Sequence, residues 1–347
     1  MSFKKDSFGL TKDGMAASLI TLKNDRIEVA VTDFGASLVA IKVPDREGVL
    51  TDIVLGYDSA EGYDSNAAFF GAVIGRNANR IALGRYEISG KPYQLAINDN
   101  DNNLHSGPNG FDKRLWEIAD LADSHVTFSL EDNDMEQGFP GIFKTTVTYS
   151  LSENTLLLHY EAACDQDTVC NPTNHVYLNL GGHSSGLITG HELTLCADFY
   201  TPVIDFQAIP TGEKAPVAGT VFDFTKPHLI GERIDAPDPQ LHFVKGYDHN
   251  YMLREHSGLK PAAAVYCEKT GIAMEIETDL PAIQLYTGNC IPENMAGKNG
   301  TVYQPRFGLC LETQYVPNAI NMDGFDKPLL KRGALFSSDT LYRFLVR

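Results

Sequence analysis

The chain has 347 residues, 43% hydrophobic and 21% charged, and its 45 Asp and Glu against 28 Lys and Arg give a formal net charge of −17. This length can bury a large core without disulfides or metals, and the composition excludes collagen-like, coiled-coil and disordered classes. The acidic excess argues against nucleic acid as a partner, because neutralising phosphates requires clustered Lys and Arg, so a neutral small-molecule ligand fits best.

Short runs of alternating apolar and polar residues predict β-strands along the whole chain. They are rich in Val, Ile, Thr, Tyr and Phe and cover residues 27–32, 143–151, 156–162, 192–197, 272–278 and 341–346. No amphipathic helix longer than about three turns is predicted. Gly and Pro are spread along the chain rather than pooled in a linker. The expected fold is therefore all-β, a large antiparallel β-sandwich forming a single domain over residues 1–347.

The ends and the cysteines indicate the compartment. Acidic residues such as Asp6 interrupt the stretch after Lys4 and Lys5, so no secretory signal is predicted. The longest weakly polar run, 67–75, is too short to cross a bilayer, and no membrane partner is expected. The six cysteines are scattered, with no C-x-x-C motif. We expect reduced thiols and a cytoplasmic location.

Residues 182–186 match G-x-S-x-G, the nucleophile elbow of α/β-hydrolases. That motif needs a helix after it, but residues 187–190 lead into another strand-like run. A Gly/Ser turn is the better interpretation of this segment than a nucleophilic Ser184.

The Asx-rich run 98–103 suggests a calcium loop. Counted from Asp99, however, Leu104 falls where an EF-hand requires Gly, and Gly110 falls where it requires Glu. We therefore predict a solvated turn at this position.

Cofactor motifs are missing from the sequence. Neither a P-loop nor G-x-G-x-x-G is found, and the ten histidines show no spacing that indicates zinc. Cys170 precedes His175 by five residues, but Asn171 and Pro172 between them disfavour a Cys–His dyad. We expect neither a cofactor nor a metal.

Five polar clusters stand beside strand-like runs, where simple alternation would be the rule. They are residues 75–81, 103–108, 171–180, 246–249 and 311–314. Each has an ordinary structural explanation, since a histidine beside a strand is more often structural than catalytic, and Arg80 and Asp248 could simply form an ion pair.

Taken together, these clusters resemble the galactose mutarotase (aldose 1-epimerase) family. The similar segments appear in the family's order along about 240 residues and are Gly75-Arg76 with 79–81, Leu104-His105 with 111–114 and Trp116, 137–141, 173–177, 247–249, 284–289 and 311–314. The resemblance implies a β-sandwich of the galactose mutarotase type with a sugar cleft. It also implies cofactor-free interconversion of the α and β anomers of aldohexoses such as galactose and glucose.

The resemblance implies roles for seven residues. Glu312 matches the family's general base and His175 its general acid, whereas the residues that would bind the sugar are Asn79, Arg80, His105, Asp248 and Gln284. Ring opening needs a base for the C1 hydroxyl and an acid for the ring oxygen, which suits an ionised Glu312 and a protonated His175. The chain departs from the family at Ser106, where Gly is usual.

Three alternatives remain open from the sequence. A glycoside hydrolase could use Asp248 and Glu312 as its carboxylate pair. A hexose-6-phosphate 1-epimerase would need further Arg or Lys in the cleft, and a non-catalytic sugar-binding protein could keep the fold without turnover. Monomer and homodimer are both compatible with the sequence.

Overall fold

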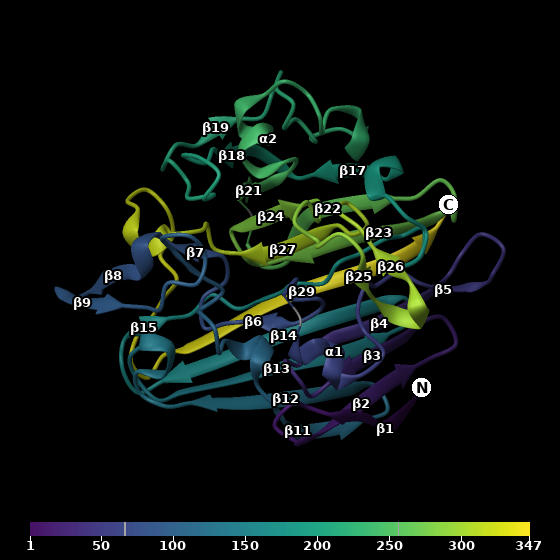
Figure 1. Ribbon diagram of the computed structural model, residues 1–347, viewed down its shortest axis with the longest axis horizontal. Coiled ribbons are helices and arrows are strands. Elements are labelled where there is room, and N and C mark those ends of the chain that lie inside the picture. Colours follow the sequence, from purple (N-terminus) through teal and green to yellow (C-terminus); the bar gives the residue numbers. More distant parts are fainter. Residues whose placement is uncertain (66, 256) are drawn as a thin grey trace.

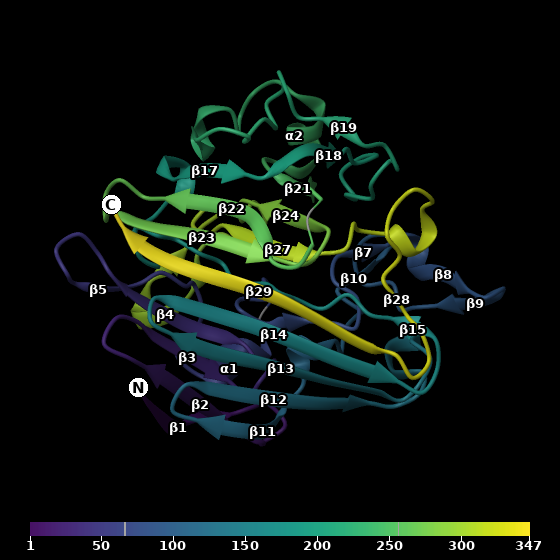
Figure 2. The same ribbon diagram turned by 180° about the vertical axis from the view of Figure 1, so that it is seen from behind.

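A computed structural model describes residues 1–65, 67–255 and 257–347. A nine-stranded antiparallel sheet forms its centre, in the order β11-β12-β13-β14-β29-β23-β22-β17-β20 (Figures 1 and 2). Its strands are β11 (Glu117–Ala122), β12 (His125–Asp132), β13 (Phe143–Ser152), β14 (Thr155–Cys164), β29 (Leu335–Val346), β23 (Ile272–Thr278), β22 (Lys260–Tyr266), β17 (Glu192–Leu195) and β20 (His228–Leu229). The strands predicted from alternation in this region are confirmed. Their apolar and polar residues alternate because one face of each strand is buried.

Strand β29 occupies the middle of this sheet. It pairs with β14 on one side and with β23 on the other, and Figure 2 shows it crossing between them. It therefore joins the strands β11 to β14 on one side of the sheet to β23, β22, β17 and β20 on the other.

Two five-stranded sheets complete the layers. The first contains β1 (Ser2–Leu10), β2 (Ala16–Lys23), β3 (Glu28–Thr32), β4 (Leu38–Pro44) and β5 (Leu50–Asp52). The second, which we call the cleft sheet, runs in the order β19 (Ala215–Pro216), β18 (Ala197–Thr201), β21 (Asp248–Leu253), β24 (Ala282–Tyr286) and β27 (Cys310–Gln314). Both sheets share one buried cluster with the nine-stranded sheet, which includes Leu22, Val147 and Leu285. The sheets thus form the expected sandwich.

Short strand pairs and single turns make up the rest. The pairs are β6 (Val73–Ile74) with β16 (Thr173–Asn174), β7 (Arg80–Ile81) with β10 (Asn103–Leu104), β8 (Arg85–Ile88) with β9 (Lys91–Gln94), β15 (Thr168–Val169) with β28 (Leu329–Leu330), and β25 (Met295–Ala296) with β26 (Val302–Tyr303). The described α-helices are α1 (Ala60–Asp64) and α2 (Pro239–Val244). The 3₁₀ turns are η1 (Ala82–Gly84), η2 (Phe111–Lys113), η3 (Glu136–Gly138), η4 (Ile188–Gly190), η5 (Ile230–Glu232), η6 (Lys298–Gly300) and η7 (Ala319–Asn321). Within the described ranges, no helix is long and apolar enough to span a membrane.

The alternation of the cleft sheet separates core from cleft. On β24, Ile283 and Leu285 join the main core, and on β27 Leu311 does the same. Because successive side chains point to opposite faces, Gln284 and Glu312 lie on the other face. This face carries the candidate site.

Candidate active site

A cleft lies between the cleft sheet and a wall of irregular segments. Its lining residues are Ala67, Ala68, Phe69, Asn79, Arg80, Asp99, Leu104, His105, His175, Tyr177, Asp248, Tyr286, Cys290 and Glu312. Six of the seven residues predicted from the sequence are in this set. The seventh, Gln284, is outside this set but is hydrogen-bonded to Asp248.

One side of the cleft, the strand wall, consists of regular β-structure. Gln284 on β24 stands opposite Glu312 on β27 in the strand register. Gln284 Nε2 donates a hydrogen bond of 2.7 Å to Asp248 Oδ1 on β21. The Gln284 amide thereby orients the Asp248 carboxylate, which is left with its second oxygen for a ligand.

The other side, the loop wall, is built from the β7–β10 pair and the residues around it. Register places Leu104 opposite Arg80. The backbone N–H of Asn79 donates to His105 Nδ1 over 3.1 Å, and His105 N–H donates to Asn79 O over 3.0 Å. Arg80 Nε donates to Asp99 Oδ2 over 2.8 Å. Side chains and backbone together therefore fix this wall.

His175, which directly follows β16, lies beside Glu312 of the strand wall. Their nearest atoms, His175 Nε2 and Glu312 Oε1, are 3.7 Å apart, and both side chains are almost completely buried. Glu312 Oε2 has no hydrogen-bond partner among the described residues. Buried polar atoms are normally paired, so this oxygen is available to accept a hydrogen bond from a sugar hydroxyl.

Burial dominates the titration of this pair. It raises the pKa of Glu312 well above the usual carboxyl range, and the charge of Asp248 raises it further while Arg80 lowers it. Burial also lowers the pKa of His175 to about 4, against the effect of that residue's own carbonyl. Both groups thus favour their neutral forms in the sugar-free cleft. This differs from the charged pair expected from the sequence, because desolvation outweighs their attraction. In either arrangement the pair holds one proton.

The hydrogen bond from Asn79 to His105 determines which ring nitrogen of His105 carries the proton. Burial, with smaller effects from His175 and Arg80, lowers the His105 pKa well below its ordinary value, so the ring is neutral near pH 7. Nδ1 accepts from Asn79 N–H and therefore lacks a proton, which places the proton on Nε2. His105 can thus donate a hydrogen bond from Nε2 to a ligand oxygen.

The same geometry bears on metal binding. His105, His175 and Glu312 offer ligand atoms within 4.8 Å of one another. A histidine that binds a metal through Nε2 normally carries its proton on Nδ1 and donates it to an acceptor. At His105, Nδ1 faces the N–H donor of Asn79 instead. This donor set suits hydrogen bonding better than metal ligation.

Asp99 and Cys310 are among the residues in and beside the site that sequence reasoning missed. Asp99, assigned to a solvated turn, lines the cleft and pairs with Arg80, and no ion pair joins Arg80 to Asp248 among the described residues. Cys310, not Cys170, is the thiol beside His175, with Sγ 3.5 Å from Nδ1. The position of Cys310 two residues before Glu312 was the available signal, since alternation puts both on one face.

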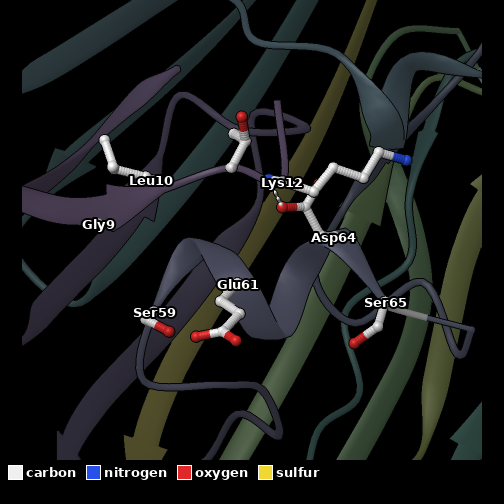
Figure 3. A pocket seen from close by; sticks show the side chains of 8 residues that line it. Gly9, Leu10, Lys12, Ser59, Glu61, Asp64 and Ser65 are labelled. Carbon is white, nitrogen blue, oxygen red and sulfur yellow. Dashed lines mark hydrogen bonds between the residues drawn. The ribbon is translucent and has the colours of Figure 1, made fainter. Parts of the chain in front are cut away.

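Other candidate features lie elsewhere. Residues 182–186 form a turn in which Ser185 Oγ donates to Asn179 Oδ1, and Ser184 is exposed. A second pocket lies between the end of β1 and α1, where Figure 3 shows the Asp64 carboxylate accepting from Lys12 N–H. None of the residues predicted to be catalytic or to bind sugar lines this second pocket.

Comparisons with known proteins agree with the geometry. The aldose 1-epimerase family profile matches residues 18–343. The chain is 41% identical over 347 residues to galactose mutarotase from Rattus norvegicus, covering 100% of this chain and 99% of that protein. It is 42% identical over 337 residues to galactose mutarotase from Homo sapiens, covering 97% and 96%. A crystal structure of an aldose epimerase homologue from C. elegans superimposes with a TM-score of 0.88 at 31% identity, covering 95% of this chain and 99% of that one. The chain belongs to the aldose 1-epimerase family.

Proposed function

We propose that this protein interconverts the α and β anomers of free aldohexoses such as galactose and glucose, as an isomerase that needs no cofactor. The observation that carries the proposal is the buried His175–Glu312 pair, with 3.7 Å between its nearest atoms, in a cleft lined by hydrogen-bonding groups. The names of its relatives, galactose mutarotase among them, support the same substrate class.

The proposed reaction opens and recloses a hemiacetal. Glu312 removes the C1 hydroxyl proton while His175 protonates the ring oxygen, and the C1–O5 bond breaks to give the aldehyde. After rotation about C1–C2, the same groups act in reverse as the ring closes on the other face. Hydrogen bonds from sugar hydroxyls favour the Glu312 carboxylate, so sugar binding moves the pair's single proton toward His175. Such an acid–base pair typically contributes about 10²–10⁴-fold in rate.

The remaining residues would hold the sugar. His105 donates from Nε2 toward the ring oxygen or a neighbouring hydroxyl. Arg80 and Asp248 bind hydroxyls through charge-assisted hydrogen bonds. Gln284 orients Asp248, and Asn79 orients His105, through the bonds described above. These contacts fix the ring relative to the acid and base, which is what the chemistry requires.

The cleft argues against a phosphorylated substrate. Arg80 is the one Arg or Lys among the described lining residues, and its Nε already bonds to Asp99. A sugar phosphate would need further cations to balance its charge. An uncharged aldose fits this lining better.

We also propose that residues 1–347 act as one unit in the cytoplasm, as a monomer or a homodimer. A single buried cluster running from Ile20 to Phe344 supports the single unit. All six cysteines are unpaired in the structure, which is compatible with a reducing compartment.

Polarimetry on freshly dissolved α-D-galactose and α-D-glucose tests the proposal. We expect the protein to accelerate the approach to equilibrium rotation over buffer alone. A rate equal to that of buffer would overturn the proposed function. Release of reducing sugar from a disaccharide would point instead to a glycoside hydrolase using Asp248 and Glu312.

A further inference from the structure

Ser106 occupies an unusual backbone position beside His105. Its φ is 71°, that of His105 is 52°, and its side chain is almost completely buried. A non-glycine residue with positive φ costs free energy relative to glycine. Contacts made by its side chain can offset part of this cost.

The Ser106 hydroxyl binds both main-chain polar groups of Asn77. Oγ accepts from Asn77 N–H over 2.8 Å and donates to Asn77 C=O over 3.1 Å. Asn77 is itself buried. Since buried main-chain groups require partners, this one hydroxyl satisfies both groups and holds the backbone at residue 77.

The segment held in this way continues directly to the partner of His105. Asn79, two residues further on, has a φ of 58° and donates its N–H to His105 Nδ1. His105 N–H returns a bond to Asn79 O. Residues 77–79 and 105–106 are thus joined by four hydrogen bonds, two at each end.

We propose that the Ser106 hydroxyl is a positioning group for His105. It fixes residues 77–79 so that the Asn79 N–H stays on Nδ1 and the Nε2–H of His105 points into the cleft. Without the hydroxyl, residue 77 would lose both of these bonds, leaving the bonds between Ala78 and Asn171 to hold the segment. Asn79 N–H could then shift away from His105, and the proton could move to Nδ1. Nε2 would then present a lone pair, rather than a donor, to the ligand. The catalytic consequence rests on the proposed epimerase function.

The test uses Ser106→Gly and Ser106→Ala. Glycine suits the positive φ, so Ser106→Gly removes the hydroxyl while favouring the backbone conformation. We expect kcat/KM for galactose to fall about tenfold or more in both variants, as for other small misplacements of an active-site group. Long-range ¹H–¹⁵N spectra of His105 should show a loss of the Nε2–H form.

Ser37→Ala is the matched control. Ser37 is also buried, and its hydroxyl donates to a backbone carbonyl, that of Phe34, over 2.9 Å. We expect its kcat/KM and its His105 spectrum to match those of the wild type. A general sensitivity to losing a buried serine hydroxyl would instead reduce activity in all three variants.

Wild-type kcat/KM in Ser106→Gly and Ser106→Ala would overturn the proposal. So would a loss of activity with an unchanged His105 spectrum, because the hydroxyl would then act by another route. The spectrum needs no substrate. If the wild type failed to accelerate mutarotation, the proposed function would fall, and the link between Ser106 and His105 would still be decided by the spectra.

Discussion

The two walls of the cleft are built in different ways. On the strand wall, Asp248 and Glu312 occupy regular positions in paired strands, whose backbone ladder sets their spacing. On the loop wall, Asn79 and His105 have positive φ and are held by bonds between side chains and backbone. The strand wall therefore tolerates a changed side chain without moving, whereas the loop wall depends on residues that never touch the sugar.

The largest expected effect is on the strand wall. Glu312→Gln keeps the size of the side chain but removes the base, so turnover of galactose should fall by about 10³-fold or more. Sugar binding, measured by calorimetry, should largely survive because the other hydrogen-bonding groups remain. Glu117→Gln, at an exposed position on β11, serves as the control. Near-normal turnover in Glu312→Gln would remove this residue from the mechanism.

On the loop wall, the largest effect should come from a residue outside the cleft. Arg76 is fully buried, donates to Asp132 over 3.1 Å, and also bonds to the carbonyls of Pro140 and Gly141. Arg76→Met should lower the free energy of unfolding by about 3 kcal/mol, since the carbonyls of Pro140 and Gly141 lose this donor and the buried Asp132 keeps only Arg114 as an ionic partner. Urea unfolding measures this, with the exposed Arg343→Met as control. A change below about 0.5 kcal/mol, typical of surface substitutions, would contradict the dependence of this wall on Arg76.

The pH profile of kcat/KM should show how the charge of Asp248 acts on Glu312 within the strand wall. If the His175–Glu312 pair must hold one proton, gain of a second proton by His175, whose pKa is about 4, sets the acid limb of kcat/KM. Loss of the proton from Glu312 sets the alkaline limb. Asp248→Asn removes a charge that raises the Glu312 pKa. The alkaline limb should then move to lower pH, while the acid limb stays near pH 4.

This profile requires the sugar's spontaneous rate to be subtracted at every pH. Asparagine keeps the oxygen that accepts from Gln284, so the strand wall should retain its shape. An alkaline limb that stays in place or rises would show that Asp248 does not act on Glu312 through its charge.

The smallest effect should come from Asp99. Asp99→Asn weakens the bond that orients Arg80, so KM for galactose should rise a few-fold with kcat nearly unchanged. Asp101→Asn, in the same turn and exposed, is the control. Initial-rate polarimetry gives both constants. An equal rise in both variants would indicate an effect of the turn as a whole.

The sequence made the regular parts of the molecule predictable and the irregular contacts much less so. The alternation of apolar and polar residues located strands such as β13, β23 and the end of β29. A strand with one buried face has an apolar residue at every second position. The seven proposed site residues came from family resemblance. The pairing of Arg80 with Asp99 could not be read from the sequence, since a carboxylate in an Asx-rich turn looks the same whether it faces solvent or a cleft. The contact between Cys310 and His175 spans 135 residues and depends on tertiary structure.

The central position of β29 also has a consequence for biosynthesis. A ribosome that has translated only as far as residue 334 has already made both neighbours, β14 and β23, but not the strand that lies between them. The exposed edges of these two strands are open to wrong pairing until β29 emerges. Completion of the sheet therefore waits until β29 has been made, and a nascent chain arrested before β29 would lack the strand that joins β14 to β23.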